Sequence, residues 1–137
     1  MIARLLPLAE VITPNIPETE VLCGFPVKNM ADMEKAGRII GANLPGAVLV
    51  KGGHLISDAV DMLYSQGTCH WFHSERIKNP NTHGTGCTLS SAIACNLAAG
   101  KSLPDSIRLA KVYLTGALKA GLNLGQGAGP LEHTYIL

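Results

Sequence analysis

The first half of the chain alternates between short apolar runs and a helical spacing of apolar side chains. Residues 8–13 form one run that ends at Pro14, and residues 47–50 form another that leads into Lys51-Gly52-Gly53. Both runs are typical of strands buried on two faces.

Two helices are predicted beside these strands. A short helix is expected from Pro17 until Gly24 stops it. After Asn29, an amphipathic helix is predicted by apolar Met33, Ala36, Ile40 and Leu44, with charged Asp32, Glu34, Lys35 and Arg38 opposite. The order strand, helix, strand predicts parallel neighbours with a right-handed crossover.

The second half predicts a hairpin followed by two helices. Residues 59–64 and 68–72 flank Ser65-Gln66-Gly67, a pattern that indicates antiparallel strands and therefore a mixed sheet. Residues 89–99 are apolar almost all round and precede Gly100, which predicts a core helix with a glycine cap. Residues 102–105 resemble a capping box for a second helix. Its apolar stripe is Leu103, Ile107, Ala110, Leu114 and Ala117, and residues 125–130 are expected to form a loop.

Composition indicates one soluble globular domain over residues 1–137. The chain is 47% hydrophobic and 15% charged, with a formal net charge of +1. The sequence has no basic block and no long apolar span, so nucleic acid and membranes are not expected as partners. Small molecules are the expected partners. The cysteines at 23, 69, 87 and 95 show no CxxC pair or zinc spacing, so reduced thiols in the cytoplasm are expected. Cys23, Cys69 and Cys95 are interpreted as packing residues.

Gly84-Thr85-Gly86-Cys87 stands at the start of the predicted core helix. Glycines there let the backbone approach an anion, and the free amides of a helix N-terminus favour negative charge. A tight turn before a buried helix is an equally good interpretation of the glycines alone. The helix dipole favours a thiolate in the first turn, so Cys87 is a candidate base or nucleophile, with packing as the alternative.

Polar residues also follow both predicted strands of the first half. Asn15 and Glu18 come just after the first strand, where open α/β sheets bind ligands, and an amide with a carboxylate can hold hydrated Mg²⁺. The alternative is a helix cap with a glutamate in the first turn. Lys51 ends the second strand and is expected at the same edge, although such lysines are usually only solvated. Asp58 and Asp61 are expected on the hairpin surface.

Three segments in this order resemble the ribokinase-like superfamily, and within it the hydroxymethylpyrimidine (phosphomethylpyrimidine) kinases of thiamine biosynthesis. They are residues 13–18 (TPNIPE), 50–54 (VKGGH) and 81–90 (NTHGTGCTLS), and residues 125–133 resemble the family's tail. The resemblance implies a three-layer αβα fold with a mixed, mostly parallel sheet, and an ATP-dependent kinase that phosphorylates hydroxymethylpyrimidine and its monophosphate. Pyridoxal kinase is the nearest alternative.

The resemblance also implies roles for the motif residues. Gly84, Thr85, Gly86 and Cys87 would form an anion hole under the transferred phosphoryl group, with Cys87 where relatives commonly carry an aspartate base. Lys51 and Thr85 would contact ATP phosphates, while Asn15 and Glu18 would organise Mg²⁺ and its waters.

The resemblance covers this chain as the C-terminal half of the family's domain. The N-terminal half carries most of the pyrimidine pocket in that family, so we expect the chain to associate with such a half or with copies of itself. A noncatalytic nucleotide-binding fragment is the alternative from another functional class.

Overall fold

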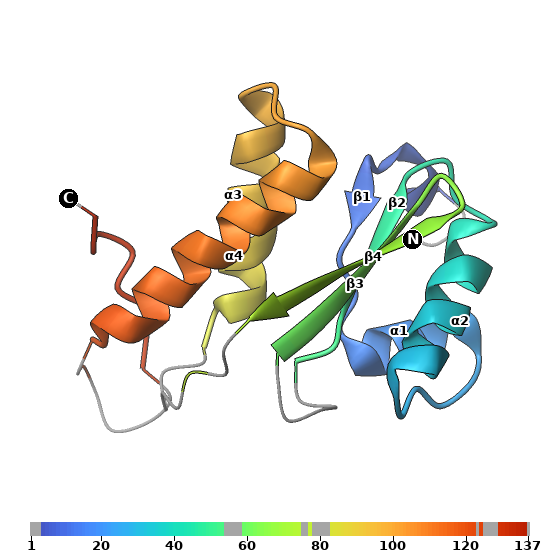
Figure 1. Ribbon diagram of the computed structural model, residues 1–137, viewed down its shortest axis with the longest axis horizontal. Helices are drawn as coiled ribbons and strands as arrows, with labels where there is room; N and C mark the ends of the chain where they lie inside the picture. Colours follow the sequence, from blue (N-terminus) through green and yellow to red (C-terminus); the bar gives the residue numbers. More distant parts are fainter. Residues whose placement is uncertain are drawn as a thin grey trace. The chain divides into compact units, whose positions relative to one another are not determined.

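The computed structural model describes residues 4–53, 59–74, 77, 83–122, 124 and 129–136. The chain divides into two units, Met1–Arg76 and Ile77–Leu137, and each is described by itself. Strands and two helices make up the first unit, and two further helices make up the second (Figure 1). In the described part of the chain, no helix is both long and apolar enough to cross a membrane.

The first unit contains one mixed sheet in the order β1-β2-β3-β4. Its strands are β1 (Val11–Ile12), β2 (Ala47–Lys51), β3 (Ala59–Ser65) and β4 (Thr68–Ser74). β1 pairs with β2 in parallel, whereas β2 with β3 and β3 with β4 are antiparallel. The predicted mixed sheet and hairpin are confirmed. Parallel pairing makes up less of this sheet than expected, because a hairpin rather than a crossover follows β2.

The first strand is shorter than the predicted run of residues 8–13. Leu6–Leu8 forms a 3-10 turn with Pro7 in its first positions, so the extended backbone begins only afterwards. Proline is tolerated at the start of a helical turn, because that amide would lack a partner there. The apolar run therefore supplies both a turn and a strand.

Two helices of the first unit start and stop at local signals. Asn15 caps α1 (Ile16–Cys23) at its N-terminus, and Gly24 ends it with a left-handed φ of 81°. Asn29 caps α2 (Met30–Gly41) by accepting a hydrogen bond from the Asp32 amide. Side-chain oxygens at these positions satisfy amides that the helix itself cannot pair. Both caps match the sequence pattern.

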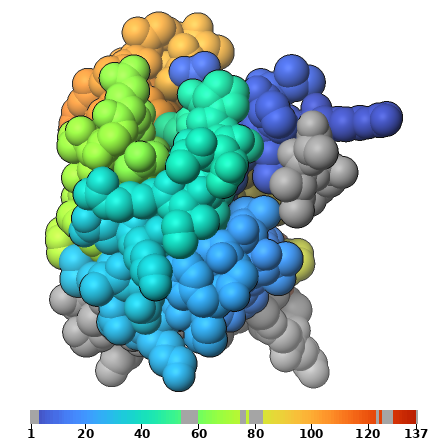
Figure 2. Space-filling view, turned by 90° about the vertical axis from the view of Figure 1, so that its right-hand side faces the viewer, coloured from blue at the N-terminus to red at the C-terminus, as the bar shows by residue number. Residues whose placement is uncertain are grey.

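The core of the first unit lies between α2 and one face of the sheet. Met33, Ala36 and Ile40 of α2 pack with Val48, Val50 and Met62 of the strands, together with Val27. Figure 2 views this unit from the side of α1 and α2, whose atoms run from blue to turquoise. Cys23 and Cys69 pack against this core, as predicted, and burial raises the pKa of the Cys69 thiol.

The second unit is a helical hairpin of α3 (Thr85–Ala98) and α4 (Leu103–Ala120). Gly100, with φ of 79°, lies in the short connection, and α4 runs back along α3 (Figure 1). The buried residues are Thr88, Leu89 and Ile93 of α3, and Ser106, Ile107, Ala110 and Ala117 of α4. Cys95 is exposed, so the prediction that it packs was wrong. Small side chains made α3 look apolar all round, but it buries only one stripe.

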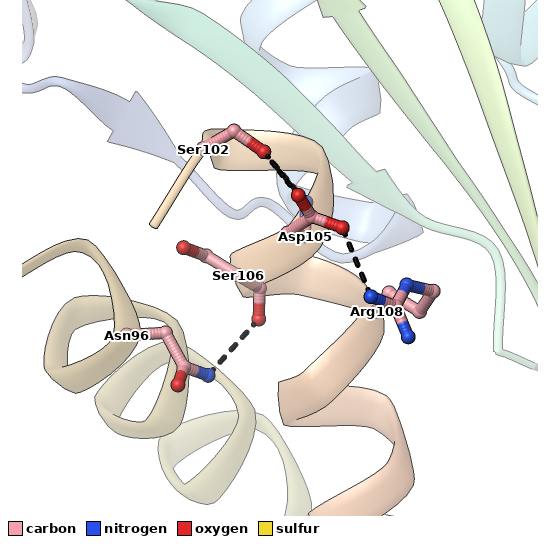
Figure 3. A network of polar contacts seen from close by, with 5 residues as sticks. All are labelled: Asn96, Ser102, Asp105, Ser106 and Arg108. Atoms are coloured by element: carbon pink, nitrogen blue, oxygen red, sulfur yellow. Dashed lines mark hydrogen bonds and ion pairs between the residues drawn. The ribbon is translucent and has the colours of Figure 1, made fainter. Parts of the chain in front are cut away.

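A polar network holds the start of α4 (Figure 3). Ser102 accepts a hydrogen bond from the Asp105 amide at 3.3 Å, and its hydroxyl donates to the Asp105 carboxylate at 2.8 Å. Arg108 pairs with the same carboxylate at 2.9 Å. The Arg108 guanidinium, followed by the Ser102 hydroxyl, lowers the pKa of Asp105. The predicted cap is confirmed.

Ser106→Ala is expected to leave the unfolding free energy unchanged or raise it by up to about 1 kcal/mol. The Ser106 hydroxyl is fully buried and has no hydrogen-bond partner among the described residues, whereas its backbone oxygen accepts from Asn96 at 3.3 Å (Figure 3). Urea unfolding measures the change, and Ser91→Ala at an exposed position of α3 gives the helix-propensity part alone. A loss of stability relative to that control would contradict the prediction.

Candidate active site

Asn15 and Glu18 form a capping box at the end of the strand β1. The Asn15 amide donates to Glu18 Oε2 at 2.8 Å, and the Glu18 amide donates to Asn15 Oδ1 at 2.9 Å. The structure therefore contains the helix cap that the sequence offered as the alternative to a metal site. Glu18 is exposed, and a carboxylate has more acceptor positions than one amide occupies. The cap fixes where this carboxylate stands.

Lys51 lies beside Asn15 at the carboxyl edge of the parallel strands. The two residues form a parallel bridge, and the Lys51 amide donates to the Pro14 carbonyl at 2.9 Å. Lys51 is the last residue of β2 and is partly buried. The predicted meeting of Asn15 and Lys51 at one edge is confirmed. Glu18 stands one helical turn further along α1.

Asp61 of β3 is part of the same neighbourhood, although the sequence pattern did not indicate it. It is only 6% exposed, and one of its carboxylate oxygens accepts from the Gly52 amide at 3.1 Å. The prediction of a surface position was wrong, since Asp61 is buried beside the turn after β2 and lies directly across from Lys51 in the strand pairing. The signal that could have found it is an aspartate between apolar Val60 and Met62, facing a glycine turn. Asp58 lies outside the described residues.

In the second unit, the glycine motif forms the N-terminus of α3. The helix begins at Thr85, ahead of the apolar run at 89–99, so Thr85, Gly86 and Cys87 make its first turn, and the predicted first-turn position of Cys87 is confirmed. Gly84 is the N-cap with φ of 82°, a conformation that favours glycine, and its carbonyl accepts from the Thr88 amide at 2.8 Å. The first amides of a helix have no partner within it.

The Cys87 thiol is exposed at this helix start. The Ser90 hydroxyl donates to the Gly86 carbonyl at 3.0 Å and to the Cys87 carbonyl at 3.1 Å, which stabilises the turn behind the thiol. Unpaired amides, a helix dipole and a nucleophilic side chain therefore occur together. This arrangement can hold an anion and accept a proton beside it.

The structure thus groups the predicted site residues into two sets. Asn15, Glu18 and Lys51 lie together in the first unit, and residues 84–87 lie together in the second. A single site built from both sets stays a prediction.

Within the described ranges, no group of three or more His, Cys, Asp or Glu side chains could hold a metal ion. Asn15 and Glu18 supply one amide and one carboxylate. Mg²⁺ usually keeps several waters and takes only one or two carboxylates beside the phosphates of a substrate. The donor set therefore fits a hydrated Mg²⁺ carried by a nucleotide, and does not fit a site made of protein ligands alone.

Comparison with known proteins gives a consistent result. The family described as phosphomethylpyrimidine kinase matches residues 1–132. A hydroxymethylpyrimidine/phosphomethylpyrimidine kinase of Streptomyces coelicolor is 48% identical over 134 residues, which are 98% of this chain and 50% of that protein.

Two solved structures are similar over the same extent. An ADP complex of Bacillus subtilis pyridoxal kinase matches with a TM-score of 0.91 and 38% identity, covering 98% of this chain and 54% of that one. Pyridoxal kinase from Staphylococcus aureus with AMP-PCP matches with a TM-score of 0.92 and 32% identity, covering 99% and 51%. These similarities confirm the predicted ribokinase-like α/β fold. The chain spans about half the length of the relatives that it matches, and it belongs to the phosphomethylpyrimidine kinase family.

Proposed function

We propose that the protein containing this chain transfers a phosphoryl group from ATP to the hydroxymethyl group of hydroxymethylpyrimidine and of its monophosphate, in thiamine biosynthesis. The observation that carries the proposal is the family match over residues 1–132, together with an exposed cysteine on a glycine-capped helix N-terminus. A general ATP-dependent alcohol kinase would need the same helix start, so the family match supports the choice of substrate.

The residues act chiefly by position and charge. Phosphoryl transfer depends on aligning the reacting oxygens and on neutralising charge that spreads over the phosphoryl group. The amides of residues 84–87 would hold the phosphoryl oxygens, Thr85 would hold the phosphate chain, and Lys51 would contact ATP phosphates. Mg²⁺ supplies further neutralisation when bound, and Asn15 and Glu18 would hold its waters.

Cys87 would act as the base for the alcohol. As the alcohol oxygen bonds to the γ-phosphorus and the bond to ADP breaks, the sulfur, acting as a thiolate, would take the alcohol proton and become the thiol. Its position in the first turn of α3 puts the thiol next to the amides that would hold the phosphoryl group. This proximity favours a proton transfer within the same site.

Pyridoxal kinase is the second candidate, because the solved structures described above carry that name. Both substrates present a primary alcohol on an aromatic ring, and residues 84–87 would serve either. Turnover of pyridoxal and hydroxymethylpyrimidine, compared at equal concentration, decides between them. Faster turnover of pyridoxal would overturn the thiamine assignment.

We further propose that the chain works in the cytoplasm and in association with an N-terminal half, or with copies of itself. Among the described strands, β1 lies at one edge of the sheet. An unpaired strand edge offers amides and carbonyls to another chain. A single monomeric species in light scattering would contradict self-association. Without an N-terminal half, the chain would be a nucleotide-binding fragment that does not catalyse phosphoryl transfer.

Lys51→Met is expected to weaken Mg-ATP binding by roughly 10-fold or more, because hydrogen bonds to charged groups contribute about 1.5–3 kcal/mol. Calorimetry on the 137-residue chain measures the affinity. Lys28→Met is the matched control, since Lys28 is an exposed lysine of the same unit. No heat and no change in melting temperature at millimolar nucleotide would reject nucleotide binding. Equal affinity of wild type and Lys51→Met would reject the role of Lys51.

A further inference from the structure

We propose that Asp61 is a positioning residue that fixes the turn after β2 and so determines where the Lys51 side chain begins. This inference rests on the proposed role of Lys51 in binding nucleotide phosphates. It concerns a residue that makes the site and does not itself touch the nucleotide.

Asp61 occupies an unusual place for a carboxylate. It lies on β3 between buried Val60 and Met62, and its own exposed fraction is 6%. In the β2–β3 pairing it stands directly across from Lys51, so both side chains leave the same face of the sheet. That face is opposite to the one where Val50 and Met62 pack against α2.

One contact of Asp61 is with the backbone immediately after Lys51, at Gly52. The Gly52 amide donates to Asp61 Oδ1 at 3.1 Å in a buried environment. Gly52 follows the last residue of β2, so its amide lies beyond the strand pairing that serves Lys51. A buried amide without an acceptor is costly, and Asp61 supplies the acceptor.

Gly52 is also held by close packing. A Cβ at this position would lie 2.1 Å from the Val60 carbonyl oxygen, so only glycine allows the two strands to approach this closely. The hydrogen bond and the close approach act on the same peptide. The backbone conformation of Gly52, directly after β2, is therefore fixed.

The other side of Lys51 is fixed as well. Its amide donates to the Pro14 carbonyl at 2.9 Å, and it forms the parallel bridge with Asn15. The backbone at Lys51 is thus held at two points: its own amide binds the Pro14 carbonyl, and the next amide, that of Gly52, binds Asp61. A side chain that must meet phosphate oxygens benefits from a fixed origin, because small displacements weaken charged contacts.

Amide hydrogen exchange and nucleotide affinity together test the role of Asp61. In the 137-residue chain, Asp61→Ala should speed exchange of the Gly52 amide by roughly 10-fold beyond any global effect, and weaken Mg-ATP binding by a similar factor. Asp61→Asn keeps an acceptor oxygen, so it should retain Gly52 protection and an affinity within about threefold of wild type. Val48→Ala, in the core away from Gly52, controls for lost stability.

The outcomes separate this inference from the proposed function. Gly52 exchange in Asp61→Ala that equals the Val48→Ala control would overturn the role of Asp61, whatever the nucleotide does. If Asp61→Ala does not fold, Asp61→Val, which also lacks an acceptor oxygen, takes its place, and Gly52 exchange equal to that of the Val48→Ala control would again overturn the role of Asp61. Absence of Mg-ATP binding by wild type overturns the proposed function, while the exchange data still decide whether Asp61 holds the turn.

Discussion

On the proposed function, Cys87→Ala is expected to lower the rate of phosphoryl transfer by roughly 100-fold in the protein that contains this chain. General bases contribute about 10²–10⁴-fold, and a thiolate matches the proton of an alcohol poorly, so the lower end applies. Nucleotide affinity should stay the same, because the anion would be held by backbone amides that the substitution leaves in place. The measurement is steady-state turnover of hydroxymethylpyrimidine with ATP, together with Mg-ATP affinity.

Cys95→Ala is the matched control for this prediction. Cys95 is a second exposed cysteine of α3, eight residues further along the helix and away from its N-terminus. The same substitution there should leave turnover unchanged. Equal turnover of wild type and Cys87→Ala would show that Cys87 is not the base. The start of α3 would then serve only to bind the phosphoryl group through its backbone amides.

Helix boundaries of this chain could be predicted where the deciding interactions are local. Asn15, Asn29 and Ser102 each cap the helix that follows, because each side chain reaches an amide only three residues away. Gly24 and Gly100 adopt the positive φ that glycine tolerates best. Such signals lie within a few residues of the boundary, so sequence spacing is enough to find them.

Features that depend on distant segments were harder to predict. Asp61 is buried, and its carboxylate accepts from the Gly52 amide, nine residues earlier in the chain. Cys95 is exposed because α3 buries a stripe that includes Leu89 and Ile93, and small apolar residues do not reveal which stripe that will be. Neither fact follows from composition or periodicity.

The candidate site was predictable to the same extent. The meeting of Asn15 with Lys51 follows from two parallel strands that end at one edge, and the bridge between these residues confirms it. The glycines of residues 84–87 lower helix propensity and left a tight turn open as an alternative, but the structure confirms a helix start there, with Gly84 as the N-cap of α3. Cys87 lies in the first turn of α3, as predicted, which is the position that the proposed chemistry needs.

Gly52→Ala is expected to lower the free energy of unfolding of the first unit by about 3 kcal/mol, the upper end of the cost of overpacking. The added Cβ would lie 2.1 Å from the Val60 carbonyl oxygen, and backbone of a paired strand cannot move aside as a side chain can. It would also lie 2.9 Å from Met33 Cε, but this is the end of a flexible side chain that can shift at little cost. Urea unfolding, followed by Trp71 fluorescence, measures the loss.

Gly53→Ala tests whether space or conformation decides the result. Gly53 has φ of 34°, and apart from its chain neighbours no atom of the described residues lies within 4 Å of where a Cβ would stand, so alanine there meets backbone strain without a clash. A single residue with a side chain at positive φ costs on the order of 1–2 kcal/mol. Gly52→Ala should therefore lower the free energy of unfolding more than Gly53→Ala. It should also disturb the backbone conformation of the turn that follows Lys51. If Gly52→Ala loses no more unfolding free energy than Gly53→Ala, the backbone near Gly52 moves apart easily. The close approach of Gly52 to Val60 would then not hold this turn in place.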